Sequence, residues 1–381
     1  MLLLVSVFTT GLWAQNYFIV KGRVTAAATG LPMQGASVFA QNTTLGTATD
    51  AEGNYKLYLP HGGYTIAVTY TGYNTESARV SNSESSDVNF VLHPREKEMA
   101  DVAVVATTEV KDGWNKYGSF FVSEFIGQGA NSAACNIKNP ETLKFYFSRK
   151  KNRLKVIAAE PLQIENKSLG YTISYALDSF TYEYKTETAV YTGSPLYSEM
   201  LSSDSIQQMS WQLAREKAYK GSILHFMRSV YQQTLSEEQF EIQFLVNHQG
   251  RDTAIALKNM YAALNYSKDD STGLVEIKPN QARLGIIYLG EKPSALYRSM
   301  NADEPGEFQF SILQFPPGES LGIEPNGYYF EQNDIVVNAY WSWEKIADQL
   351  PYNYGWTINS TQAPPEPPMS IQPSPAPQSV Q

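Results

Sequence analysis

Histidine and glutamate at the spacing of a zinc site are the first residues that could do chemistry. The segment from His93 to Glu96 reads H-x-x-E, which supplies two of the three protein ligands that a catalytic zinc needs. A third ligand would have to be His225 or His248, and neither histidine stands in a matching sequence context. The pattern therefore leaves a zinc-dependent hydrolase as an alternative with an incomplete set of ligands.

Other catalytic motifs are missing from the sequence. It has no G-x-S-x-G elbow and no Walker loop, and the segment Gly127 to Gly129 lacks the third glycine of a dinucleotide-binding loop. The single cysteine, Cys135, excludes an internal disulfide and every multi-thiolate metal site, so we expect a small buried side chain there. His225 lies between apolar residues of an amphipathic pattern, which favours a structural imidazole over a general base. We therefore predict no cofactor and no enzymatic activity.

The elements that would position such residues begin with short alternating strands between Val20 and Leu92. Glycine-containing turns separate these strands at regular intervals, a pattern typical of a small antiparallel sandwich. The sharpest turn runs from Asp50 to Gly53, since an Asp side chain initiates a turn and glycine tolerates a positive φ. The next strand is expected to place Tyr55, Leu57 and Leu59 on one face.

The order of these motifs closely resembles the carboxypeptidase-like regulatory domain. The sequence has G-x-V at Gly22, T-G-x-P-x-x-G-A-x-V from Thr29, G-T-x-T-D-x-x-G-x-Y from Gly46, and Y-x-G-Y ending in Gly72 and Tyr73. The resemblance implies an all-β, transthyretin-like sandwich over residues 20–93 that binds or braces and performs no chemistry. In zinc carboxypeptidases the regulatory sandwich follows the catalytic domain, whereas here it comes first.

Length and composition set broad limits. A chain of 381 residues, 43% of them hydrophobic, is long enough to form two domains with their own cores. The aromatic share of 13% favours β-rich structure. A net charge of −9 argues against a nucleic-acid partner, because a phosphate backbone needs clustered Lys and Arg.

The apolar segment from Met1 to Ala14 indicates a secretory signal over residues 1–15, although the usual positive start is missing. A first buried strand is the competing interpretation. The segment is too short to span a bilayer and no later stretch is long enough, so no transmembrane segment is expected in the mature chain. We expect an exported protein, in the periplasm or associated with the outer membrane.

Residues 94–113 are expected to form a charged linker with one strand. The linker opens at Pro94 and leads to D-V-A-V-V-A-T at Asp101 to Thr107. This run resembles the segment that the TonB protein captures by strand addition in outer-membrane transporters with the same leading domain. An ordinary linker strand is the alternative, and both interpretations stay open.

Residues 114–360 are expected to form an α+β domain of mainly antiparallel strands with a central helical pair. Alternation predicts strands at Leu143–Phe147, Leu154–Ala158, Leu169–Leu177, Phe180–Lys185, Ala189–Tyr191, Ile242–Val246, Ala282–Leu289, Phe308–Phe315 and Ile335–Asn338, and a short helix at Trp343–Ala347. Hairpin tips are expected near Lys151 and Thr186. Capping signals predict helix starts at Asp204 and Ser236, and Gly221 separates the first helix from a second.

Two further segments resemble exported Bacteroidota proteins described only as carboxypeptidase-like regulatory domain-containing. Pro161 to Tyr171 reads P-L-x-I-x-N-x-x-L-G-Y, and the helical pair carries a W…R…A-Y-x-G-S…H-F-hydrophobic-R-S signature. Structural roles are expected for Trp211, Tyr219, Gly221, His225 and Arg228 of that signature, and for Asp50, Gly53, Gly72 and Tyr73 of the sandwich. The resemblance implies no mechanism, because the molecular role of that family is not established.

Residues 361–381 are rich in Pro, Ser and Gln and are expected to form a disordered tail, because such a composition cannot bury a core. The whole chain favours a non-enzymatic exported envelope protein that acts as a binding or structural adaptor module. Its expected partner is an envelope protein or a polysaccharide. A zinc-dependent carboxypeptidase-type hydrolase and an accessory to TonB-dependent outer-membrane uptake are the alternatives.

Overall fold

The computed structural model describes residues 17–81, 87–95, 108–248, 251–316, 318–330 and 335–355. Four predictions fall outside these residues, namely the export signal at 1–15, Glu96 of the zinc pattern, the strand-like run at 101–107, and the tail at 361–381.

The N-terminal part is a β-sandwich of two sheets, with the strand orders β4-β1-β7 and β3-β2-β5-β6. Its strands are β1 (Tyr17–Ala26), β2 (Ser37–Ala40), β3 (Gly46–Ala48), β4 (Asn54–Pro60), β5 (Gly63–Thr69), β6 (Glu76–Ser81) and β7 (Phe90–Leu92). Tyr55, Leu57 and Leu59 of β4 are buried in the core between the sheets, which confirms the predicted alternation.

One pairing departs from the antiparallel sandwich that the sequence predicts. Strands β1 and β7 are parallel, with Val24 opposite Phe90. Because β6 belongs to the other sheet, the chain crosses between the sheets before β7 and returns in the direction of β1. Alternation within a strand carries no information about such a crossing.

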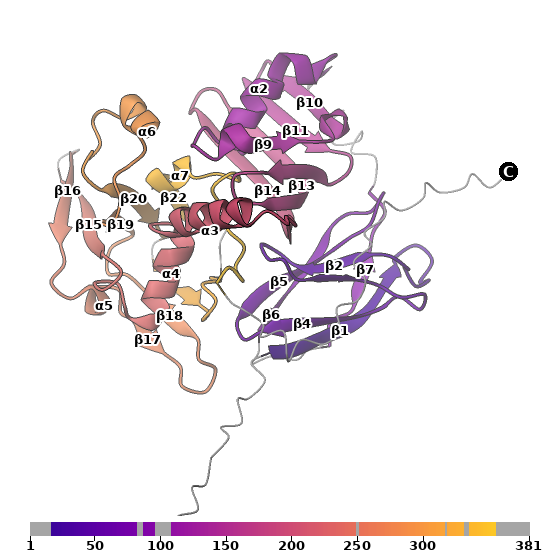
Figure 1. Cartoon of the computed structure of the whole chain (residues 1–381), viewed down its shortest axis with the longest axis horizontal. Coiled ribbons are helices and arrows are strands. Elements are labelled where there is room, and N and C mark those ends of the chain that lie inside the picture. Colours follow the sequence, from indigo (N-terminus) through magenta and orange to yellow (C-terminus); the bar gives the residue numbers. More distant parts are fainter. Residues whose placement is uncertain are drawn as a thin grey trace, which may run out of the picture.

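A seven-stranded sheet follows, and helix α2 (Gly113–Phe125) covers one of its faces (Figure 1). Its strands are β8 (Thr108–Glu109), β9 (Cys135–Ile137), β10 (Leu143–Ser148), β11 (Arg153–Ala158), β12 (Leu162–Asn166), β13 (Tyr171–Glu183) and β14 (Thr188–Glu199), with short 3-10 turns at Ser132–Ala134 and Pro140–Thr142. Phe121 and Phe125 of α2 are fully buried against the sheet. Strand alternation alone does not predict this helix.

The hairpins of this sheet confirm the predicted tips and correct one strand. Asn152 and Glu187 turn the chain with φ of 47° and 52°. The two strands predicted at Leu169–Leu177 and Phe180–Lys185 are the single strand β13, with a register shift between Leu177 and Ser179. A β-bulge lets pairing continue past an interruption in the alternation, which the sequence presents as a break.

Helices α3 (Ser205–Tyr219) and α4 (Ile223–Gln232) form the predicted helical pair. The Asp204 side chain caps α3 by accepting the N–H of Ile206 at 2.9 Å. The helix start predicted at Ser236 is wrong, because residues 235–239 form turns and Gln239 adopts a φ of 64° just before β15.

The last part contains a five-stranded sheet of order β16-β15-β19-β20-β22 and a smaller sheet of order β17-β18-β21. Its elements are β15 (Phe240–His248), β16 (Arg251–Ala256), α5 (Met260–Ala263), β17 (Ser267–Lys268), β18 (Val275–Ile277), β19 (Arg283–Tyr288), α6 (Ala295–Met300), β20 (Gln309–Gln314), β21 (Leu321–Ile323), β22 (Val336–Ala339) and α7 (Tyr340–Trp343). The helix predicted at Trp343–Ala347 is wrong, since α7 ends at Trp343. Beyond it, Ile346 and Ala347 leave this sheet and join the core of the seven-stranded sheet.

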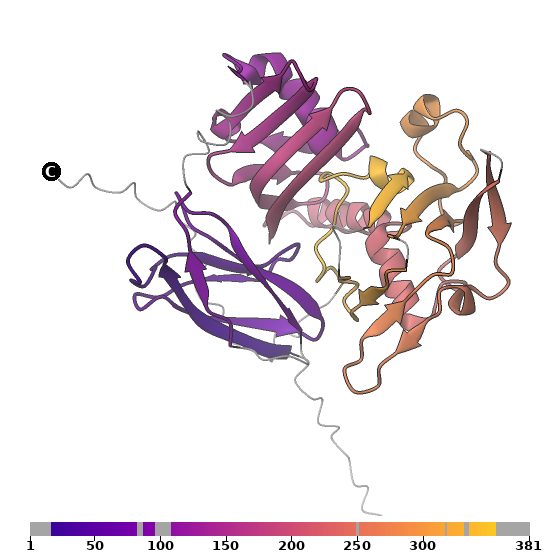
Figure 2. The same ribbon diagram turned by 180° about the vertical axis from the view of Figure 1, so that it is seen from behind.

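Residues 114–360, predicted as one α+β domain, contain two separate hydrophobic cores. One lies between α2 and the seven-stranded sheet, and the other joins α4 to the five-stranded sheet. Figures 1 and 2 show the sandwich, the magenta sheet and the orange sheet as three bodies, with α3 and α4 between the two sheets. The mainly antiparallel α+β class is confirmed, while the domain boundaries stay a prediction. Among the described residues, no helix combines the length and the apolar character needed to cross a membrane.

Candidate functional site

The predicted turn of the sandwich is built around the Asp50 carboxylate. Its Oδ1 accepts the N–H groups of Asn54 at 2.7 Å and Glu52 at 3.1 Å. Gly53 closes the turn with a φ of 78°, and a Cβ there would lie 2.6 Å from the carbonyl oxygen of Val24. The turn therefore needs glycine both for its conformation and for its close approach to β1.

Gly72 and Tyr73 form a second turn of the sandwich. Gly72 has a φ of 84°, and its carbonyl oxygen accepts the N–H of Arg95 at 2.8 Å. The ring of Tyr73 packs edge-on against Tyr70 with 5.6 Å between centroids. This turn fixes the segment through which the chain leaves the sandwich.

The zinc pattern has one described member. His93 is largely exposed, and its Nδ1 lies 3.2 Å from Oε1 of Glu76, while Glu96 is outside the described residues. Over the described part of the chain, no group of three His, Cys, Asp or Glu side chains is placed to hold a metal ion.

Helix α3 holds the two segments that resemble the Bacteroidota proteins together. Nε1 of Trp211 donates to the carbonyl oxygen of Lys167 at 2.9 Å, and the Arg215 guanidinium donates to the carbonyl oxygens of Leu169 and Gly170. A Cβ on Gly170 would lie 2.4 Å from the Trp211 ring. The two sequence segments therefore pack directly against each other.

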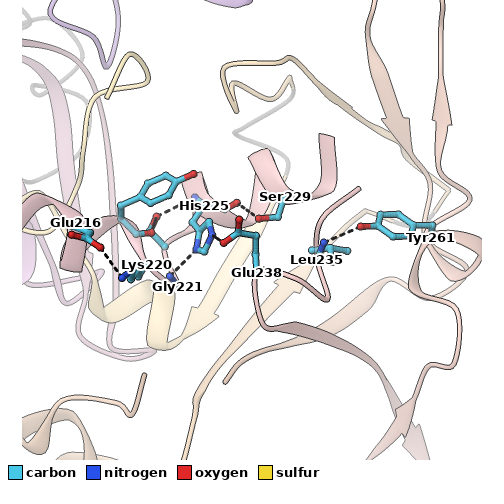
Figure 3. A network of polar contacts seen from close by, with 10 residues as sticks. Glu216, Lys220, Gly221, His225, Ser229, Leu235, Glu238 and Tyr261 are labelled. Atoms are coloured by element: carbon cyan, nitrogen blue, oxygen red, sulfur yellow. Dashed lines mark hydrogen bonds and ion pairs between the residues drawn. The ribbon is translucent and has the colours of Figure 1, made fainter. Parts of the chain in front are cut away.

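His225 is the centre of a polar network at the start of α4 (Figure 3). Its Nδ1 accepts the N–H of Gly221 at 3.1 Å, so the proton of the neutral ring is on Nε2, which donates to Oε2 of Glu238 at 3.0 Å. The ring also packs against Tyr219 and Phe240. Burial lowers the pKa of His225, and the hydrogen bond to Glu238 opposes that shift. With both ring nitrogens engaged, the imidazole has no site left for a substrate proton.

Gly221 permits the tight connection between α3 and α4. Its φ is 79°, and a Cβ would lie 2.3 Å from Oε1 of Gln309 and 2.6 Å from the Tyr288 ring. Its carbonyl oxygen accepts Nε1–H of Trp341 at 2.7 Å. The helical pair is thereby fastened to the five-stranded sheet.

Arg228 is a buried guanidinium that donates only to backbone carbonyls. Nε bonds to Asn326 at 3.1 Å, Nη1 to Tyr354 at 3.0 Å and Nη2 to Tyr352 at 2.8 Å. Its side chain also lies over the Tyr219 ring, 5.5 Å from the centroid. The guanidinium therefore ties the 324–328 loop and the C-terminal segment to α4.

Both segments that Arg228 holds contact the sandwich directly. Nδ2 of Asn326 donates to the carbonyl oxygen of Gly63 at 3.0 Å, and the N–H of Tyr352 donates to the carbonyl oxygen of Asn42 at 2.6 Å. A Cβ on Gly63 would lie 2.6 Å from the Glu324 side chain, so this glycine permits the close approach. We call this set of contacts the sandwich seat.

A cleft of about 330 Å³ lies where α2 faces α6 and α7. Its lining residues are Ser123, Glu124, Gln128, Tyr297, Met300, Asn301, Glu304, Ala339, Ser342, Trp343 and Lys345. Helix α2 covers the seven-stranded sheet, whereas α6 and α7 accompany the five-stranded sheet, so the cleft is lined from both bodies. Clefts between structural units are common sites of ligand binding.

Most of the charged groups of the cleft are already paired. Nζ of Lys345 lies 3.1 Å from Oε2 of Glu124, and the Tyr297 hydroxyl donates to Glu304. The Tyr297 ring meets Trp343 edge-on at 5.5 Å, which fixes one aromatic wall. Amide and hydroxyl groups supply the remaining polar lining. The arrangement suits a neutral polar ligand.

Ala339 forms part of the cleft lining in a strained conformation. Its φ of 60° and ψ of −134° belong to a region that favours glycine. Strained residues persist where the surrounding structure determines them, and they gather at ligand sites.

Comparison with known proteins identifies the sandwich. Residues 20–104 match the model of the CarboxypepD_reg-like domain. The sandwich is a CarboxypepD_reg-like domain. Two relatives match this part, the TonB-dependent receptor P3 of Formosa agariphila with 26% identity and the TonB-dependent receptor SusC of Bacteroides thetaiotaomicron with 33%, each over 92 residues. Each match covers 24% of this chain and 9% of the receptor, so the chain spans a small part of these relatives.

Solved structures resemble the whole chain only distantly. A putative membrane-associated protein of unknown function from Bacteroides fragilis is 11% identical, with 85% of this chain and 95% of that chain covered and a TM-score of 0.17. The major pilin subunit BcpA of Bacillus cereus is 12% identical, with 84% and 96% covered and a TM-score of 0.16. Similarity this weak gives no information about the CarboxypepD_reg-like domain or the rest of the chain.

The structure brings Tyr219, Gly221, His225 and Arg228 together and places Trp211 farther along α3, on the seven-stranded sheet. The sandwich residues lie in two turns, one with Asp50 and Gly53 and the other with Gly72 and Tyr73. The sequence predicts neither the cleft nor the sandwich seat, since the residues of both come from segments that are distant in the chain. The pair Gly62 and Gly63 is the one local signal of the seat, because adjacent glycines permit close backbone approach.

Proposed function

We propose that the chain is a non-enzymatic, exported protein of the cell envelope that acts as a binding and adaptor module. The CarboxypepD_reg-like domain and its occurrence in two TonB-dependent receptors support an envelope location. The periplasm or the outer-membrane surface is the proposed compartment. Binding takes place in the cleft between the seven-stranded and five-stranded sheets, and the sandwich braces these two sheets.

The sandwich seat is the observation that carries this proposal. A tethered regulatory domain needs only a linker, whereas this sandwich is hydrogen-bonded to two segments that a single buried arginine, Arg228, holds in place. Across the same contact, the guanidinium of Arg79 lies 3.5 Å from the centroid of Phe330. An adaptor that presents two binding surfaces in a fixed orientation requires such an arrangement.

The cleft is the proposed ligand site, and its chemistry favours a neutral polyhydroxylated ligand such as a polysaccharide segment. Hydroxyl groups both donate and accept hydrogen bonds, as the amides of Gln128 and Asn301 do. The paired charges of Glu124 and Lys345 leave little attraction for an ionic ligand. The half-buried Trp343 offers an apolar surface.

Titration of the full chain with neutral oligosaccharides from envelope polysaccharide, followed by calorimetry, tests the ligand class. We expect Gln128→Ala to weaken binding about tenfold, which corresponds to one lost hydrogen bond. Gln212→Ala, on the exposed side of α3, is the matched control and should bind as the wild type does. Absence of binding to any of these oligosaccharides would contradict the assignment.

Crosslinking in native envelopes followed by identification of the captured partner tests the adaptor role. A second candidate function, an accessory role in TonB-dependent uptake, is favoured by the two receptor relatives. Co-purification of the chain with a transporter would support that candidate, and capture of a different envelope protein would support the general adaptor role.

A further inference from the structure

Strand β14 forms one edge of the seven-stranded sheet, and half of that edge is covered by the sandwich. β13 pairs with β14 along its whole length on one side. On the other side, the carbonyl oxygen of Pro195 accepts the N–H of Asn42 at 2.9 Å, and the N–H of Tyr197 donates to the carbonyl oxygen of Thr43 at 2.9 Å. A short extended segment of the sandwich therefore already pairs with this edge.

The other half of β14, Thr188–Gly193, presents the same kind of edge. Backbone groups two residues apart point to the same side of a strand, so those of Ala189, Tyr191 and Gly193 point in the direction of Pro195 and Tyr197. Within the described part of the chain, no hydrogen bond reaches these three backbones from that side. Val190, between them, is 59% exposed.

This half-strand lacks the protection that other long edge strands of the described chain have. Among these edge strands, β4 contains Lys56 and Pro60, and β6 contains Glu76 and Arg79. Charges and proline on an edge prevent pairing with another chain. Thr188–Gly193 reads T-A-V-Y-T-G, with no charge and no proline.

We propose that Thr188–Gly193 is a dimerisation edge that pairs antiparallel with the same segment of a second copy. Antiparallel pairing of a strand with its own copy matches every donor with an acceptor about a two-fold axis, so an uncharged edge is self-complementary. With Val190 on the axis, Val190 lies opposite its counterpart, and Ala189 lies opposite Tyr191 of the other copy. This register keeps the second copy clear of the Asn42–Thr44 contact.

Light scattering of the full chain over a range of concentrations provides the first test. We expect the mass of two chains, with a dissociation constant in the micromolar range that a small interface gives. Val190→Lys should raise that constant at least tenfold, because it places two cations directly opposite each other. Val336→Lys, an exposed edge valine of β22 that is 49% exposed, is the matched control and should leave the dimer intact. A monomer at every concentration, or equal effects of both variants, would overturn the proposal.

Disulfide trapping provides a second test that does not depend on the strength of the dimer. Directly opposed residues of neighbouring strands lie within the range that a disulfide requires, so Val190→Cys should form a covalent dimer under mild oxidation. The native background is quiet, because burial raises the pKa of the Cys135 thiol to about 12. Val336→Cys should stay monomeric on a denaturing gel. A Val190→Cys chain that melts like the wild type but does not crosslink would overturn the proposal.

Discussion

Polar and charged side chains serve different purposes at the α3–α4 junction and in the cleft between α2 and α7. At the junction, His225 and Arg228 are buried, and most of their donors and acceptors meet backbone atoms. In the cleft, Glu124 and Lys345 pair with each other, and the neighbouring Gln128 is exposed. Backbone partners hold structure, whereas side-chain pairs at an open surface leave room for a ligand. The chemistry of a residue therefore does not decide its role until its partners are known.

Removing Arg228 should produce the largest effect, because the junction would lose its link to the sandwich seat. Arg228→Met removes one donor from each of three carbonyls, one buried and two partly buried, and we expect the free energy of unfolding to fall by about 3 to 5 kcal/mol. Denaturant unfolding measures the loss. Arg298→Met, on the exposed side of α6, should change stability by less than about 0.5 kcal/mol. Similar losses for both variants would mean that Arg228 is not an anchor.

The sandwich turn should be the next most sensitive place. Gly53→Val combines a positive φ with a clash against the Val24 carbonyl, so we expect a loss of about 3 kcal/mol. Gly35→Ala also faces a positive φ but has open space around its Cβ, and about 1 kcal/mol is expected. Thermal melts decide between them, since equal melting temperatures would show that the contact with β1 contributes nothing.

A variant on the cleft side should increase stability. Ala339→Gly removes the strain of a left-handed alanine, and we expect a gain of about 1 kcal/mol in the free energy of unfolding. Ala302→Gly, in an exposed turn, is the control and should be neutral or slightly destabilising. A loss of stability in Ala339→Gly would show that the alanine methyl group is needed for packing.

The junction should also give a small pH dependence. Burial holds the pKa of His225 below 6.5, so below that pH the unfolded chain binds a proton that the folded imidazole resists. Stability should therefore fall as the pH drops below 6.5 and stay level above it. Unfolding of the wild type and of His225→Gln on both sides of 6.5 isolates this contribution, with His61→Gln as the exposed control. The idea fails if His225→Gln keeps the full pH dependence of the wild type.

The smallest expected effect is on metal content. We expect no stoichiometric zinc, because His93 is exposed and paired with Glu76 rather than held in a shell of ligands. Elemental analysis of protein purified without chelator or metal-binding tag measures this directly. One zinc per chain, lost on His93→Ala, would make hydrolysis the leading hypothesis.

The sequence predicts local features of this molecule well. Asp50 and Gly53 act within a few residues of each other, and the helical pair is defined by caps and a glycine that are close in the chain. The bulge in β13 and the end of α7 at Trp343 are harder to predict, because pairing and packing with distant segments override the local pattern. Helix α2 is also hard to predict from the sequence, since its aromatic residues fit a strand equally well.

The cleft and the sandwich seat could not be predicted from the sequence. Asn326 and Gly63 are 263 residues apart, and the cleft joins α2 to residues near 345. The periodicity of a single sequence gives no information about contacts between residues so far apart in the chain. His225 shows the opposite case, because its amphipathic surroundings favour the structural role that its two hydrogen bonds now support.

The sandwich seat also constrains the order in which the molecule can assemble. The side chains of Thr44 and Asn353 are hydrogen-bonded across 309 residues, almost the full length of the described chain. Contacts of such large sequence separation form late in folding. A chain that emerges from its N-terminus can therefore complete the sandwich core early, but the sandwich reaches its final orientation only when Tyr352 and Asn353 arrive. Until then, a partner that recognises the assembled surface would have nothing to bind.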